Sequence, residues 1–158
     1  MRKIAIRYGL WMFVGFTIFF FVMHFFGFSQ RYDLRVFNGV IHLSLMYLAI
    51  REYRNKNEES VNNYVSGVAM GMYTSVIGVL PFTIVMFLYL VLNPDFMANV
   101  TNNADLQRFI TPLTASLFIF TEGIAVSLIG SYIETRIIDA SISRARSKAS
   151  QSSQTQNN

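Results

Sequence analysis

The sequence predicts an all-α membrane protein: a four-helix transmembrane bundle, up-down-up-down, with both the N- and C-termini in the cytoplasm. Hydrophobic residues make up 53% of the 158 residues and charged residues only 14%, well below the roughly 25% charged residues of soluble domains. The apolar residues fall into four long segments, each near the length that crosses a bilayer. Lys and Arg gather in the segments that an even number of spans places on one side of the membrane.

The four expected spans differ in length and composition. They cover about residues 8–28, 32–50, 65–92 and 110–133. The second has only 15 strictly uncharged residues, 36–50, which rise about 22 Å as a helix. We therefore expect its helix to begin earlier, with Arg35 reaching toward the interface. The third is longer than a bilayer needs, and Pro81 lies near its middle, where it can kink the helix.

The positive charges orient these spans. Ten of the 13 Lys and Arg residues lie in the N-terminus, in the loop 51–64 or in the C-terminal tail, and the other three are Arg31, Arg35 and Arg108. Cytoplasmic loops are enriched in Lys and Arg, so we expect both termini inside and the polar connection 93–109 outside. The same rule explains the net charge of +4 without nucleic acid as a partner.

The chain is expected to form one membrane domain and a tail. Residues 1–136 hold the four spans and leave no length for a second, soluble core. Residues 137–158 are first basic and then polar, and their composition from about residue 147 predicts disorder. The chain has no cysteine and two histidines, so we expect no metal site and no cofactor. Because phosphate-binding loops and nucleophile motifs are also missing, we expect no enzymatic activity.

Glu122 is the most informative candidate residue. It lies near the middle of a run of 24 residues, 110–133, that carries no other charge. Placing a carboxylate inside a bilayer costs free energy, so such a residue is expected to have an interacting group or a functional role. In a square of four helices the second and fourth spans occupy opposite corners, and inward-facing residues of both can meet at the centre.

Polar residues of two other spans are the expected partners of Glu122. Arg35, Asn38 and His42 are spaced i, i+3, i+7, which places them on one helix face running from the outer interface to the midplane. We expect Glu122 to meet His42, or the hydroxyls of Tyr73 and Thr74. One interpretation is a proton or ion relay through the bundle. The other is polar contacts that fix helix packing, with the Glu122 carboxyl hydrogen-bonded.

Small residues predict where the helices approach closely. They recur at i+4 steps in the third and fourth spans: Gly67, Gly71 and Ser75, then Gly123, Ser127 and Ser131. Such stripes let backbones touch in lipid. They favour packing within one chain, and homodimerisation is the alternative.

Short motifs along the chain suggest a family. They are Tyr8–Leu10, Leu48–Arg54, Asn93–Phe96, Phe120–Gly123 and Ser127–Ile129. In order and spacing this pattern resembles a bacterial family of small four-span inner-membrane proteins, catalogued as domain of unknown function 4199, over about Ile4–Arg136. The resemblance implies a bacterial inner membrane, four spans and an acidic residue in the last span, which Glu122 matches. It implies no activity, and the Asn-rich connection 93–109 departs from the family pattern.

We therefore expect an integral membrane protein that acts as a structural or accessory component. Its partners would be the lipid bilayer and a protein still to be identified, and a homo-oligomer is possible. The alternative is a small proton-linked transporter or channel subunit that uses Glu122 and His42.

Overall fold

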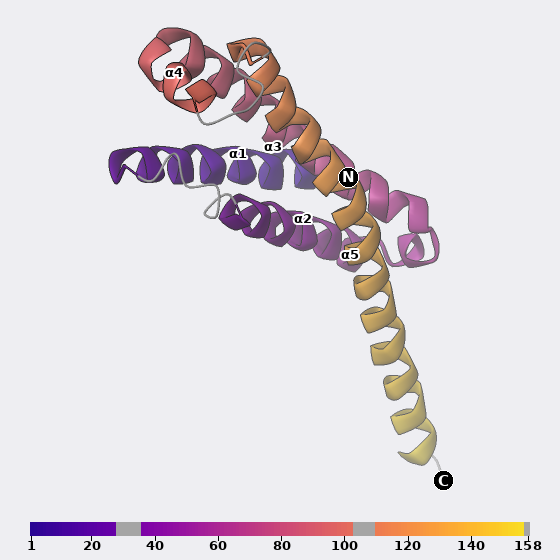
Figure 1. Ribbon diagram of the computed structural model, residues 1–158. Coiled ribbons are helices and arrows are strands. Elements are labelled where there is room, and N and C mark those ends of the chain that lie inside the picture. Colours follow the sequence, from indigo (N-terminus) through magenta and orange to yellow (C-terminus); the bar gives the residue numbers. More distant parts are fainter. Residues whose placement is uncertain (28–35, 103–109, 157–158) are drawn as a thin grey trace.

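The chain is all-helical in the part that the computed structural model describes, residues 1–27, 36–102 and 110–156, which contains no strand. In order, its elements are α1 (Arg2–Phe25), α2 (Val36–Lys56), the 3-10 turn η2 (Glu58–Asn62), α3 (Tyr64–Leu92), α4 (Pro94–Asn102) and α5 (Pro112–Gln156), as Figure 1 shows. The predicted all-α class is confirmed.

Among the described residues, three helices are long and apolar enough to cross a membrane. They are α1, α3 and the part of α5 from Pro112 to Ser152, which cover most of the first and fourth expected spans and all of the third. The second expected span, 32–50, corresponds to α2, which does not reach the same mean hydropathy. Polar residues inside α2 and the charged residues of its last turns account for this. Arg35 lies outside the described residues.

Local sequence signals explain the ends of several helices. The Asn63 side chain accepts a hydrogen bond from the Ser66 backbone N–H and thereby caps the start of α3. Helix α3 continues through Pro81. In the connection 93–109, which was expected to be polar and outside the membrane, α4 begins at Pro94 with Asp95 in its first turn. Proline at a first helical position and acid in a first turn both favour helix initiation.

Helix α5 extends well past the membrane domain. Its 45 residues end at Gln156, and in Figure 1 its C-terminal part stands away from the other helices. Disorder was expected from about residue 147, so the structure differs from that expectation. Serine side chains bond backward to the helix backbone there, for example Ser147 to the Arg144 carbonyl and Ser152 to the Ala149 carbonyl.

The helices pack as two triangles that share one edge. Helix α3 contacts α1, α2 and α5, and α2 contacts α1 and α5 as well. No comparable set of contacts joins α1 to α5 in the described part of the chain. The expected square placed the second and fourth spans at opposite corners, but α2 and α5 are direct neighbours. Small residues allow this closer packing, since the Cβ of an alanine at Gly130 would lie 2.7 Å from Met46 Cε of α2.

The outside of these helices is apolar. Large hydrophobic side chains are exposed on every helix of membrane length, including Trp11 at 62%, Leu88 at 52% and Phe118 at 69% of their accessible surface. Soluble monomers rarely expose contiguous apolar surface on this scale. The interior holds small and flexible side chains: Ala5, Met12, Met46, Ala49, Met70 and Val79. This distribution fits helices surrounded by lipid.

Candidate functional site

A polar contact of three helices lies at the centre of the bundle. His42 of α2 is buried, and its Nε2 lies 2.9 Å from Ser75 Oγ of α3 and 3.0 Å from Ser127 Oγ of α5. The edge of the His42 ring meets Phe16 of α1, with the ring centres 5.7 Å apart. One side chain therefore ties α2 to all three of its neighbours.

The serine contacts indicate which atom of this group carries the proton. Ser127 Oγ donates to the Gly123 carbonyl at 2.5 Å, and Ser75 Oγ donates to Met46 Sδ at 3.4 Å. With both hydroxyl hydrogens used in this way, both serine oxygens act as acceptors, and His42 Nε2–H donates to them. This tautomer is assigned from the hydrogen-bond pattern. His42 Nε2 and both serine hydroxyls therefore have their partners within the chain.

The structure corrects the expected meeting of Glu122 with His42. Glu122 is exposed on α5, five positions before Ser127, which corresponds to about 140° around the helix axis. It therefore lies on a different face of α5 from the one that touches His42.

The other expected partners are also placed elsewhere. Tyr73 is exposed on α3. Thr74 is buried, but its hydroxyl donates to the Met70 carbonyl of its own helix at 2.9 Å. Asn38 Oδ1 is buried with no hydrogen-bond partner in the described part of the chain. Of the expected polar residues that the structure describes, His42 is the one that makes the central contact with Ser75 and Ser127.

Both small-residue stripes lie at helix contacts within the chain. A Cβ added at Gly67 would lie 2.5 Å from Thr135 Cγ2, one at Gly71 would lie 2.6 Å from Ser131 Cβ, and one at Gly123 would lie 2.7 Å from Val79 Cγ1. Ser75, Ser127 and Ser131 are buried beside them. These residues are thus occupied by α3–α5 packing rather than presented to a second copy.

A buried arginine joins α2, η2, α3 and α5 at one end of the bundle. Arg54 is only 1% exposed. Its Nε lies 2.9 Å from Asp139 Oδ1, and its NH2 donates to Asp139 Oδ2 at 3.0 Å. Its NH1 donates to the carbonyls of Ser60 and Asn63 and to Ser66 Oγ. Sequence reasoning missed this residue, because in the sequence Arg54 resembles the other positive charges of the polar loop 51–64.

A second ionic group lies nearby on the surface. Glu52 accepts hydrogen bonds from Lys56 Nζ and Tyr8 OH, both at 2.8 Å, and from Arg7. The hydrogen bond from Lys56 and, to a smaller extent, the one from Tyr8 hold the pKa of the Glu52 carboxyl below its usual range. This group ties the start of α1 to the end of α2.

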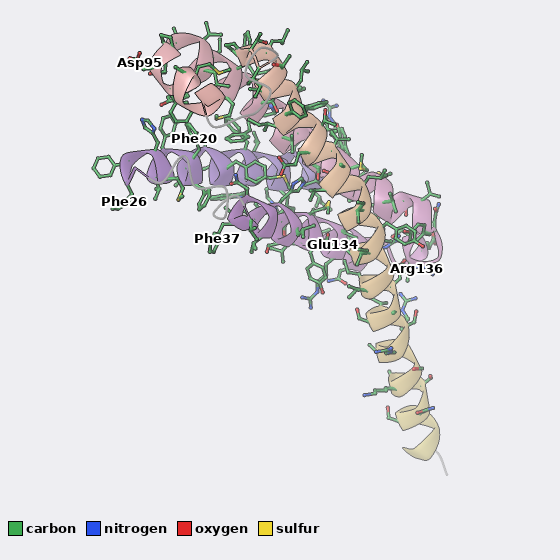
Figure 2. The ribbon with its side chains drawn as sticks, viewed as in Figure 1. Phe20, Phe26, Phe37, Asp95, Glu134 and Arg136 are labelled. Atoms are coloured by element: carbon green, nitrogen blue, oxygen red, sulfur yellow. The ribbon has the colours of Figure 1, made fainter. Side chains whose placement is uncertain are left out.

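Glu134 is the other residue that sequence reasoning missed. It is 8% exposed, and its Oε2 is buried without a hydrogen-bond partner among the described residues. It borders a groove between α2 and α5, and Figure 2 labels it where α5 passes α2. The sequence held one signal: Glu134 directly follows the uncharged run 110–133, at a span end where cations are the rule.

The opposite end of the bundle is aromatic. Phe20 and His24 of α1, Tyr89 of α3 and Phe96 of α4 pack together, with ring centres 5.1 to 6.4 Å apart. Tyr89 OH lies 3.2 Å from His24 Nε2. Figure 2 shows Phe20 directed toward α4. Aromatic residues are enriched at membrane interfaces.

Among residues 1–27, 36–102 and 110–156, no group of three or more His, Cys, Asp and Glu residues could hold a metal ion.

Comparison with known proteins gives one match. The family model described as protein of unknown function (DUF4199) matches residues 7–109, which is more than half of the chain. The matched region ends before α5 and so does not include Glu122. No curated protein matches the chain. No solved structure matches it either.

Proposed function

The chain belongs to the DUF4199 family of proteins of unknown function, and we propose that it is a four-span structural or accessory protein of the bacterial inner membrane. In this proposal both termini are cytoplasmic, the chain has no enzymatic activity, and its partner is another membrane protein. The observation that carries the structural role is the centre of the bundle. There the buried His42 Nε2 bonds to the hydroxyls of Ser75 and Ser127, so the polar groups of three helices are engaged in holding the helices together.

The surface of α2 supports its role as the fourth span. Its mean hydropathy is low, but its polar residue His42 points inward, and α2 packs against α1, α3 and α5. Large apolar side chains lie on its outer side, with Val36, Phe37, Val40 and Leu43 all exposed. A helix that turns its polar side chains toward the inside of a bundle can meet lipid with an apolar face.

The distribution of charged residues supports the orientation. Arg7, Glu52 and Lys56 interact at one end of the bundle, and Arg54 binds Asp139 there. The opposite end holds the aromatic cluster of α1, α3 and α4. Because positive charge is typical of the cytoplasmic side, this distribution supports a topology with the N-terminus, the α2–α3 connection and the C-terminal part of α5 inside.

Single cysteines test this topology directly, because the natural chain has none. We expect Asp95→Cys, on α4, to react with a membrane-impermeant maleimide in intact cells. Asn55→Cys and Ser147→Cys should react only after the membrane is opened. The measurement is the labelled fraction on a gel, with the unmodified chain as the control. Labelling of residue 147 in intact cells would contradict cytoplasmic termini.

A functional test follows from the proposed accessory role. A tagged chain, cross-linked in the membrane and purified in mild detergent, should retain one membrane protein in a fixed ratio. A chain with a destabilised bundle should lose that protein. Purification with no partner at any cross-linker concentration would contradict the proposal.

Proton-linked transport through Glu122 makes a different prediction. Because His42 Nε2 is bonded to two serines and Glu122 lies on another face of α5, we expect purified protein in vesicles to pass no more protons than protein-free vesicles. A pH-sensitive dye inside the vesicles measures this flux. Flux in the natural chain that Glu122→Gln abolishes would overturn the structural proposal.

A further inference from the structure

A groove runs between α2 and α5 at the cytoplasmic end of the bundle. It has a volume of about 400 Å³ and is lined by Leu43, Ser44, Tyr47, Leu48 and Glu134. Leu43 and Leu48 are exposed, so the groove is open to the medium that surrounds the helices. Under the proposed function, on which this inference rests, that surrounding is the bilayer.

The ionisable group in this groove is the carboxyl group of Glu134, which has no partner among the described residues. Glu134 Oε2 is buried and accepts no hydrogen bond from any described residue. The arginines on either side are engaged elsewhere: Arg54 binds Asp139, and the Arg136 guanidinium lies over the Tyr64 ring, 5.4 Å from its centre. The chain thus supplies no cation to Glu134 in its described part.

A buried carboxylate of this kind needs either a proton or a donor from outside the chain. Removing a carboxylate from water without a hydrogen bond is strongly unfavourable. An ammonium group supplies both charge and N–H donors, and the strongest hydrogen bonds are those between charged groups. Beside the carboxylate, Leu43 and Leu48 offer an apolar surface suited to an alkyl chain.

The position of the groove along the membrane normal indicates which class of ligand it binds. Glu134 follows the uncharged run 110–133 directly and lies level with the end of the bundle that holds Arg54. This is the depth at which lipid headgroups meet acyl chains. We propose that the α2–α5 groove binds a bilayer lipid whose headgroup carries a primary amine, with the ammonium on Glu134 and an acyl chain along Leu43 and Leu48.

Native mass spectrometry of the full chain tests this proposal. The protein is reconstituted in vesicles with equal amounts of phosphatidylethanolamine, phosphatidylcholine and phosphatidylglycerol of one acyl composition, then released in mild detergent. Phosphatidylcholine carries the positive charge without N–H donors, and phosphatidylglycerol has no cation. We expect phosphatidylethanolamine to be retained about tenfold over either, the scale of one charge-assisted hydrogen bond.

Two variants locate the site. Glu134→Gln should reduce the enrichment to about one, whereas Glu59→Gln, an exposed acid of η2 that does not line the groove, should keep it. Leu48→Trp fills the groove without touching the carboxyl group and should also abolish retention, so the test stands even if Glu134→Gln does not fold. Far-UV circular dichroism melting identifies folded variants.

Specific results would overturn the proposal. Equal retention of the three lipids, or unchanged enrichment in both Glu134→Gln and Leu48→Trp, rules out an amine site in the groove. Loss of a co-purifying protein, with lipids unaffected, assigns the groove to a protein partner instead. Failure of the membrane location itself is detected separately, because the chain would then be released from membranes by alkaline washing.

Discussion

Replacing Arg54 by methionine is expected to lower the free energy of unfolding by about 3–5 kcal/mol, the cost of removing one member of a buried ion pair. The guanidinium is buried and satisfies groups on α2, η2, α3 and α5 together. Without it, Asp139 loses its cationic partner, and the carbonyls of Ser60 and Asn63 each lose one of their donors, keeping the local bonds from Asn63 and Ser66. The measurement is unfolding of the purified protein in mild micelles by added SDS, followed by circular dichroism.

Arg51→Met is the matched control, because Arg51 lies on the same helix but is exposed. Its effect should stay within about 0.5 kcal/mol, as for most surface substitutions. The double variant Arg54→Met with Asp139→Asn should recover part of the loss, since it no longer leaves a carboxylate unpaired. Equal stability of the two single variants would show that the buried ion pair does not hold these elements together.

Replacing Gly71 by alanine is expected to destabilise the chain by about 1–3 kcal/mol, as overpacking of a core does. The new Cβ would lie 2.6 Å from Ser131 Cβ and 3.1 Å from Ile50 Cδ1. Ser131 Cβ is attached directly to the backbone, so α3 and α5 would have to move apart. The same SDS titration measures the loss.

Gly39→Ala provides a control of opposite sign. A Cβ at Gly39, in α2, meets nothing within 4 Å. Alanine there should be neutral or stabilise the helix by up to about 1 kcal/mol, the difference in helix propensity. Adding Ser131→Gly to Gly71→Ala removes the colliding atom and should restore most of the stability. Similar effects of Gly71→Ala and Gly39→Ala would mean that α3 and α5 do not pack through Gly71.

Apolar length was sufficient to predict where the long helices lie. Expected spans 8–28, 65–92 and 110–133 fall within α1, α3 and α5 apart from a few residues at their ends, because backbone groups in an apolar run are satisfied most simply by a helix. Helix ends were less predictable: α1, α2 and α5 run past the apolar runs into charged sequence. In charged sequence the backbone N–H and C=O groups can bond either to water or within a helix. Hydropathy therefore does not show at which residue the helix ends.

The rotation of each helix about its axis could not be predicted from one sequence. Glu122 and Ser127 are both polar residues within the same apolar run, yet Ser127 faces the centre of the bundle and Glu122 is exposed. That choice depends on which small residues meet across α3 and α5, and on the contact between α2 and α5 that a square arrangement lacks. The burial of Arg54 and Glu134 follows from the same packing, so neither could be distinguished from a surface charge beforehand.

The pairing of Arg54 with Asp139 has a consequence for biogenesis. The two residues are 85 positions apart, so the ribosome needs about 4–17 s to deliver Asp139 after Arg54 at about 5–20 residues per second. Throughout that interval Arg54 is solvated or held only by the nearby Ser60, Asn63 and Ser66. When α5 arrives, Asp139 pairs with Arg54 and fixes the connection between α2 and α3. Packing of the last helix therefore completes the assembly of the earlier ones.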